Sequence, residues 1–196
     1  MSQPYYLLEK YYSEVEPGKA LDLGCGDGAN SIFLAKQGFE VESIDIKEDY
    51  VENLKNLSKK EGLSLKVKKE DIREFGFDKE YDLILAVNSL QFMKKSEREE
   101  VISKIKSSLN SNALVFISVF TKEDVSYKKL SKNHSPIEEN TFYSKNENRY
   151  WNFFEPNELK NYFKDNFKIL FYDERIVDDA HSDPHQHGIA ELVVQK

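Results

Sequence analysis

The sequence predicts an α/β fold with one doubly wound, seven-stranded and mostly parallel sheet and helices on both of its faces. Short apolar runs alternate with amphipathic stretches along most of the chain, as a parallel sheet with crossover helices requires. Three alternating glycines follow directly after the first short apolar run. The run Tyr81–Val87 is continuously apolar after Asp82, which is typical of a strand buried on both faces.

The expected elements follow from these runs and from the turn residues that bound them. Strands are expected over 20–23, 39–46, 63–67, 81–87, 113–120, 167–176 and 188–194. Helices are expected over 5–15, 29–37, 50–57, 101–109 and 156–163. Gly38 and Gly62 provide C-terminal stops for the second and third helices, and Pro156 suits the first turn of the last.

The length of 196 residues supports one sizeable core and hardly two, so a single domain over 1–196 is expected. Residues 1–120 form the expected cofactor-binding core. The segment 121–155 is largely polar with little periodicity, and such long connections are often functional lids. Residues 156–196 are expected to add a closing helix and two strands on the substrate side.

Composition excludes several classes of protein. Lys and Arg number 28 against 35 Asp and Glu, and the resulting charge of −7 argues against a general nucleic-acid binder. The single cysteine, Cys25, permits neither a disulfide within the chain nor a cysteine-based zinc site. No apolar run approaches the roughly 20 residues of a membrane span, and the first residues lack a signal-peptide pattern. A cytoplasmic monomer or homodimer acting on a small molecule is expected, with no nucleic-acid or membrane partner.

The strongest local signal is the stretch Leu21-Asp-Leu-Gly-Cys-Gly-Asp-Gly-Ala-Asn30, which joins the first strand to a helix. Glycines at Gly24, Gly26 and Gly28 let the backbone turn tightly and approach a ligand without a Cβ in between. The helix that follows offers unpaired N–H groups at its start. This loop is therefore predicted to bind a cofactor.

Two cofactor classes suit such a loop. Gly24-x-Gly26-x-x-Ala29 satisfies the dinucleotide fingerprint, with Asp45 at a suitable distance to hold a ribose. However, Asp22 precedes the first glycine, and its carboxylate would repel a pyrophosphate and attract an ammonium group.

Two more acidic residues indicate the other parts of a cofactor that carries an ammonium group. Asp45 ends the second strand, where a carboxylate accepts from both ribose hydroxyls, and Asp71 follows the third strand, where it accepts from an exocyclic amine. An ammonium group, a ribose and an adenine together describe S-adenosylmethionine, with adenosylhomocysteine as the product of methyl transfer. A nicotinamide-dependent oxidoreductase and a non-catalytic adenosylmethionine-binding module remain the alternatives.

The chain here resembles the class I S-adenosylmethionine-dependent methyltransferases, which have a Rossmann-like fold. The matching motifs cover residues 15 to 120 in order, and they are Ala20–Gly28, Val41–Ile46, Glu70–Ile72 and Tyr81–Ala86. The resemblance implies that the glycine loop packs against the methionine part and that Asp45 holds the ribose. It also implies that Ile46 and Ile72 flank the adenine and that Asp71 meets the adenine amine. Val87 and Asn88 would then close the site after the fourth strand.

The carboxyl-terminal part contains three of the four histidines within seven residues, at His181, His185 and His187. Three interpretations stay open for this tail. It is a solvated polar loop, a metal site of histidine and carboxylate ligands, or an unliganded substrate pocket. In a pocket, histidine serves as a base near neutral pH or donates to an anionic substrate. We take the three histidines as candidate catalytic residues and assign no metal.

Within the class, Tyr150–Lys160 and His187–Leu192 resemble the tellurite-resistance methyltransferase group. That resemblance implies methylation of small soft nucleophiles such as tellurite, selenite or a thiol, in a pocket lined by a histidine near His181 and by arginines of the last strands. This sequence departs from the pattern, because it has only four arginines and none follows His181. The departure counts against an oxyanion substrate but not against methyl transfer.

Aromatic residues supply further candidates for the site. Tyr5, Tyr6 and Tyr11 are placed to cover the cofactor from the first helix, and Trp151 and Phe154 to wall the substrate pocket. Core packing is the alternative for all five, since 13% of the residues are aromatic.

A soft, deprotonated nucleophile needs little beyond in-line positioning and desolvation, whereas an oxygen or nitrogen nucleophile needs a base.

Overall fold

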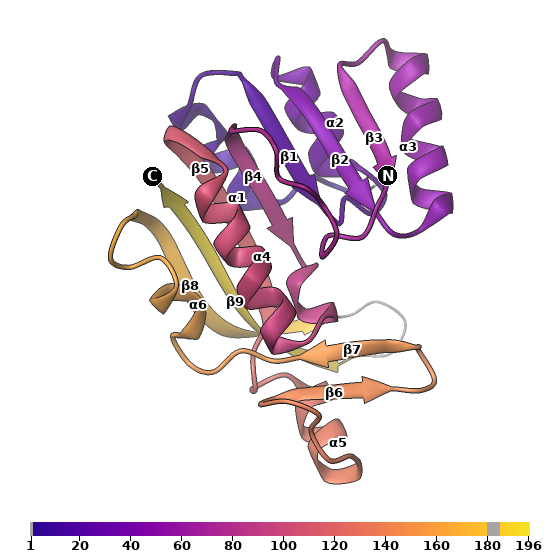
Figure 1. Cartoon of the computed structure of the whole chain (residues 1–196), viewed down its shortest axis with the longest axis vertical. Helices are drawn as coiled ribbons and strands as arrows, with labels where there is room; N and C mark the ends of the chain where they lie inside the picture. The colour runs from indigo at the N-terminus through magenta and orange to yellow at the C-terminus, as the bar shows by residue number, and fades with distance from the viewer. Residues whose placement is uncertain (1, 180–184) are drawn as a thin grey trace.

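The computed structural model describes residues 2–179 and 185–196 and has one large sheet between helices (Figure 1). The strands of this sheet are β1 (Lys19–Leu23), β2 (Glu40–Asp45), β3 (Leu65–Lys69), β4 (Tyr81–Val87), β5 (Leu109–Phe120), β8 (Lys168–Asp179) and β9 (His185–Gln195). The helices are α1 (Tyr6–Tyr11), α2 (Ala29–Lys36), α3 (Glu48–Glu61), α4 (Lys95–Ser107), α5 (Val125–Asn133) and α6 (Glu158–Asn161), with short 3-10 turns η1 (Tyr12–Glu14) and η2 (Leu90–Phe92).

The sheet has the strand order β3-β2-β1-β4-β5-β9-β8. Strands β3, β2, β1, β4 and β5 pair in parallel, whereas β9 runs antiparallel to both of its neighbours. The predicted doubly wound, seven-stranded, mostly parallel sheet is therefore confirmed. The strand order reverses between β1 and β4, and in open α/β sheets ligands bind beyond the carboxyl ends of the strands at such a point.

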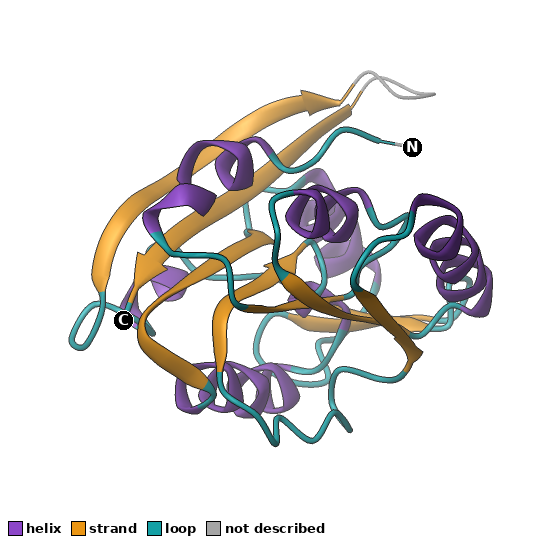
Figure 2. Ribbon diagram, turned by 90° about the horizontal axis from the view of Figure 1, so that it is seen from above, coloured by secondary structure: helices purple, strands orange, loops and turns teal. Residues whose placement is uncertain are grey.

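Helices cover both faces of the sheet (Figure 2). The sequence of β4 is continuously apolar because its side chains alternate between two cores, one on each face of the sheet. Leu83 and Leu85 pack on the side of α1 and α2, while Ile84 and Ala86 pack on the side of α4. All four side chains are fully buried. Among the described residues, no helix is both long and apolar enough to cross a membrane.

The segment expected to be a polar connection contains regular structure. Its first part is α5, which is capped by Asp124, whose Oδ1 accepts from the Ser126 N–H at 2.7 Å. Its second part is an antiparallel hairpin of β6 (Thr141–Ser144) and β7 (Arg149–Asn152). The hairpin lies beyond the ends toward which the arrows of β1 and β4 point (Figure 1).

The hairpin was missed because each of its strands has only four residues, which is too short for a clear period-2 pattern. The available signal was aromatic: Phe142 pairs with Trp151 across the hairpin, and Phe142 and Phe153 are buried. The last expected helix, over 156–163, is shorter in the structure and is limited to α6.

Two glycines with the same left-handed backbone differ in their surroundings. Gly28, before α2, has φ +84°, and an added Cβ would lie 2.4 Å from Leu54 Cδ1 in a buried cluster. Gly62, after α3, has φ +64°, and an added Cβ would meet nothing within 4 Å. Gly28 is therefore needed for both backbone conformation and packing, and Gly62 for conformation alone.

Replacing each glycine by alanine separates these two contributions. Gly62→Ala is expected to lower the free energy of unfolding by about 1 kcal/mol, the cost of a left-handed alanine. Gly28→Ala is expected to lower it by about 3 kcal/mol, because overlap with Leu54 is added to that cost. Urea unfolding of both variants measures the difference, and equal losses would contradict the packing argument.

Candidate functional site

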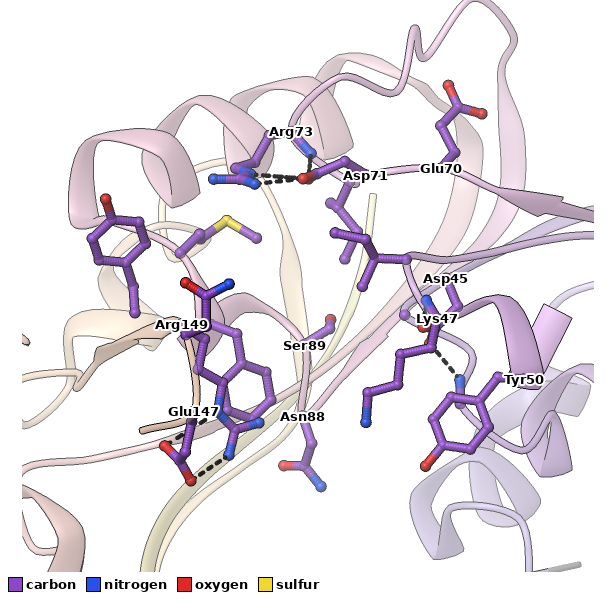
Figure 3. Close-up of a pocket in the computed structure, with 18 of the residues that line it drawn as sticks. Asp45, Lys47, Tyr50, Glu70, Asp71, Arg73, Asn88, Ser89, Glu147 and Arg149 are labelled. Atoms are coloured by element: carbon purple, nitrogen blue, oxygen red, sulfur yellow. Dashed lines mark hydrogen bonds and ion pairs between the residues drawn. The ribbon is translucent and has the colours of Figure 1, made fainter. Parts of the chain in front are cut away.

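A cavity of about 850 Å³ opens at the point where the strand order reverses (Figure 3). Its walls come from the loops that follow β1, β2, β3 and β4, from η2, and from the β6–β7 hairpin. The lining residues are Gly24, Gly26, Asp45, Ile46, Lys47, Tyr50, Glu70, Asp71, Ile72, Arg73, Asn88, Ser89, Phe92, Met93, Tyr143, Glu147, Asn148, Arg149 and Tyr150.

The glycine loop forms the inner wall and is tied to the end of β2. The N–H groups of Gly24 and Cys25 donate to the Ile44 carbonyl at 2.9 and 3.0 Å. The Gly26 N–H donates to Asp45 Oδ2 at 2.9 Å. Gly26 has φ +54°, and a Cβ there would meet no atom within 4 Å, since that position faces open space in the cavity wall. The loop thus brings bare backbone to the cavity, as the sequence predicted.

Three of the predicted cofactor-binding residues do not line the cavity. Asp22 is 1% exposed and accepts from the Ser31 hydroxyl at 2.6 Å. Gly28 packs against Leu54, and Val87 packs against the core on the side of α1. All three therefore pack inside the protein rather than against the cavity.

The burial of Asp22 changes the role expected for it. Desolvation raises the pKa of Asp22 to about 6, and the hydrogen bond from Ser31 opposes that rise. The Ser31 hydroxyl in turn accepts from Ser43 on β2 at 2.9 Å. Asp22 therefore connects β1, α2 and β2 through these hydrogen bonds. Its burial does not support the direct contact with an ammonium group that the sequence suggested.

The residues expected around a ribose and an adenine do line the cavity together. Asp45 accepts from the Lys47 N–H at 2.9 Å with the oxygen that Gly26 does not use. Ile46 is 61% exposed and Tyr50 37%, which leaves large apolar surfaces at the cavity wall. Ile72 lies on the wall with them. Exposed apolar surface of this kind within a concavity marks a ligand site.

Asp71 is held in place by a neighbour that the sequence analysis did not single out. The Arg73 Nε donates to Asp71 Oδ1 at 2.9 Å, and the Arg73 backbone N–H donates to the same oxygen at 3.0 Å. These hydrogen bonds hold the pKa of Asp71 below its usual range. Asp71 therefore offers a fixed, ionised acceptor to the cavity.

The hairpin contributes a second charged pair on the opposite wall, around Glu147 and Arg149 (Figure 3). The Arg149 guanidinium donates to Glu147 at 3.1 Å and lies 4.3 Å from the ring centroid of Phe92 and 4.4 Å from that of Trp151. Burial raises the pKa of Glu147, but hydrogen bonds from Trp151 and Arg149 outweigh it, so the pKa lies below its usual range. Sequence reasoning missed this wall together with the hairpin.

Two of the predicted histidines lie at the start of β9, outside the cavity lining. His187 Nδ1 is 2.7 Å from Asp124 Oδ2, and the His187 ring stacks on Phe120 with centroids 4.8 Å apart. His185 Nε2 is 2.9 Å from His187 Nε2. His181 lies outside the described residues. Within 2–179 and 185–196, no group of three or more His, Cys, Asp or Glu is arranged to hold a metal ion.

The other candidates are distributed between core and surface. Phe154 is fully buried in the core on the side of α4, so it is a packing residue. The Tyr5 and Tyr6 hydroxyls donate to the buried Glu191 carboxylate at 2.8 and 2.7 Å, which anchors the start of α1 to β9. Cys25 is buried, which raises the pKa of its thiol and makes it a spacer in the loop.

Comparisons with known proteins show the family of the chain. Residues 10–190 match the family described as tellurite resistance protein TehB. A relative from Haemophilus influenzae, named probable S-adenosyl-L-methionine-dependent methyltransferase TehB, is 26% identical over 163 residues, which are 83% of this chain and 50% of that protein. The chain therefore spans about half the length of the curated relatives it matches.

Solved structures show the same fold. TehB from Haemophilus influenzae superimposes with a TM-score of 0.79 at 23% identity, over 98% of this chain and 62% of that one. A methyltransferase described as SAM-dependent, from Methanosarcina mazei, gives a TM-score of 0.76 at 22% identity, over 100% of this chain and 99% of that one. The family match covers most of the sequence, and the chain therefore belongs to the family described as tellurite resistance protein TehB.

Proposed function

We propose that this protein transfers the methyl group of S-adenosylmethionine to a small-molecule acceptor. The observation that carries the proposal is the cavity at the strand-order reversal, whose lining includes the backbone of Gly26 and the carboxylates of Asp45 and Asp71. The expectations of a single domain, a cytoplasmic location and a monomer or homodimer stay predictions.

The chemistry of the cavity wall fits the cofactor. Asp45 and Asp71 are the proposed partners of the ribose hydroxyls and the adenine amine, with Ile46 and Ile72 on the two faces of the base. Ser89 adds an independent sign of a ligand. It lines the cavity and is 7% exposed, and its buried hydroxyl has no hydrogen-bond partner among the described residues. A buried hydroxyl without a partner is costly unless a ligand satisfies it.

The bound cofactor supplies a methyl group on a positively charged sulfur. The residues of the chain bind and orient the two reactants and exclude water, because in-line positioning and desolvation supply much of the rate of such a transfer. The hairpin wall at Glu147 and Arg149, opposite Lys47 and Tyr50, is the proposed acceptor side (Figure 3).

The acceptor proposed from the family resemblance is a soft nucleophile such as tellurite, selenite or a thiol. Arg149 brings a positive charge to the acceptor wall that the arginine-poor last strands do not supply. Its ion pair with Glu147 balances that charge, so the wall as a whole does not select for an anion. His181, His185 and His187 are proposed to act on the acceptor rather than on the cofactor.

Thermal unfolding distinguishes the proposed cofactor from a dinucleotide. Adenosylhomocysteine at 100 times its Kd is expected to stabilise the protein by about 2.7 kcal/mol and to raise the Tm accordingly, because it binds only the folded chain. NAD at the same concentration is expected to leave the Tm unchanged. Stabilisation by NAD alone would support a nicotinamide-dependent oxidoreductase and contradict the proposal.

A glycine substitution tests where the cofactor lies. Gly26→Val is expected to weaken adenosylhomocysteine binding by more than about 100-fold, roughly 3 kcal/mol, because the side chain fills the space above the loop. Gly62→Val is the matched control, since Gly62 also has a positive φ and open surroundings but lies away from the cavity. Titration calorimetry measures both, with far-UV circular dichroism to check the fold. Equal affinities in the two variants would show that the loop does not hold the cofactor.

A further inference from the structure

The proposed acceptor side of the cavity is rich in aromatic side chains. Phe92, Tyr143 and Tyr150 line it and are each half-buried, so they contribute flat apolar surface that a ligand can contact. Tyr143 and Tyr150 pair across the hairpin with ring centroids 5.3 Å apart. Pockets lined in this way, with a few polar groups among aromatic rings, bind organic molecules.

Arg149 lies among these rings on a fixed support. Its guanidinium carbon is 4.3 Å from the ring centroid of Phe92 and 4.4 Å from that of Trp151. The two rings meet at 80° with centroids 5.2 Å apart, so the guanidinium lies in the corner between them. Trp151 is backed by the fully buried Phe153, whose ring is nearly parallel to it. Trp151 does not line the cavity, so a ligand on this wall meets Arg149 and Phe92 instead.

One edge of the Arg149 guanidinium is already occupied. Its Nε and Nη2 donate to the two carboxylate oxygens of Glu147 at 3.4 and 3.1 Å, and the Trp151 Nε1–H donates to the same carboxylate. Arginine recognises carboxylates through such paired hydrogen bonds, and here they balance the charge of Arg149. An oxyanion placed on Arg149 would lie beside the Glu147 carboxylate and be repelled by it.

The charges around the cavity also disfavour an anionic acceptor. Three basic and four acidic side chains line it, so its walls carry a small negative excess. That excess suits a cofactor with a positively charged sulfur and opposes a multiply charged anion. What Arg149 still offers is planar surface, because 37% of its side chain is exposed and a guanidinium stacks on flat conjugated rings.

We propose that the methyl acceptor is an organic molecule with a planar conjugated ring, which stacks on Arg149 and Phe92 while its nucleophilic atom points to the cofactor. This inference rests on the proposed methyl transfer and chooses among its acceptors. A thiol attached to a flat ring fits the wall, whereas selenite and tellurite do not. Arg149 is a specificity-determining residue that acts through its flat face, and Glu147 keeps its charge from selecting an anion.

Two thiols that differ in the flatness of the ring test the stacking. Phenylmethanethiol and cyclohexylmethanethiol are titrated into the full chain saturated with adenosylhomocysteine. The indole ¹H–¹⁵N signal of Trp151, the only tryptophan in the sequence, reports the Kd of each. The wild type is expected to bind the phenyl compound at least about 5-fold more tightly. In Arg149→Lys, which keeps the charge but loses the flat face, the two Kd values are expected to agree within about 2-fold.

Arg175→Lys is the matched control for this substitution. Arg175 is 35% exposed and also pairs with carboxylates, but it lies outside the lining of this cavity. The control is expected to keep the wild-type preference, and both variants are expected to keep their affinity for adenosylhomocysteine, which shows that they fold. Equal binding of the two thiols by the wild type, or an unchanged preference in Arg149→Lys, would overturn the proposal.

Selenite tests the role of Glu147. It is expected to leave the Trp151 signal of the wild type unchanged and to shift it in Glu147→Gln, because the charge of Arg149 is then unbalanced. No response in Glu147→Gln would contradict the charge balance on which the choice rests. Wild-type binding of selenite that is tighter than binding of phenylmethanethiol would favour an oxyanion acceptor and overturn the proposal. Failure of adenosylhomocysteine to bind would count against the proposed methyl transfer instead.

Discussion

The site depends on how the chain leaves β1. The backbone has to turn at a positive φ at Gly24 and again at Gly26, and the second turn is held by the hydrogen bond from the Gly26 N–H to Asp45. That bond joins the ends of two neighbouring parallel strands, so the loop and the carboxylate occupy fixed positions relative to each other. Asp22 supports the same junction from inside, through Ser31. The cavity exists because this junction leaves bare backbone where the strand order reverses.

The half of the molecule that holds the proposed cofactor residues was predictable from the sequence, and the reason is physical. Strands buried on both faces leave continuous apolar runs, and their carboxyl ends meet at one edge of the sheet. Residues at those ends, such as Asp45 and Asp71, therefore come together whatever the lengths of the helices between them. Asp22 shows the limit of this reasoning. Its place in the chain suggested a ligand contact, but β1 is buried on both faces, and the Asp22 side chain lies against α2, where it accepts from Ser31 and is 1% exposed.

The half that holds the proposed acceptor side was not predictable in the same way. The β6–β7 hairpin consists of two four-residue strands, and its charged pair, Glu147 and Arg149, lies within or beside a turn. One partner of His187 is Asp124, which lies 63 residues earlier in the chain. Neither the hairpin nor this pairing leaves a periodic pattern, because both are set by tertiary contacts. The histidine cluster could be noticed in the sequence, but the acid that orients one of its members could not.

The proposed cofactor residues were thus predictable from the sequence, whereas the proposed acceptor side was found in the structure. Both proposals depend on where the cofactor lies relative to Gly26 and Asn88. The measurement that tests this most directly is a crystal structure of the chain with adenosylhomocysteine. We expect the ribose hydroxyls on Asp45, the homocysteine part over Gly26, and the sulfur facing the side of Asn88 and the hairpin. A ligand bound elsewhere, or a sulfur facing Lys47 and Tyr50, would contradict this expectation.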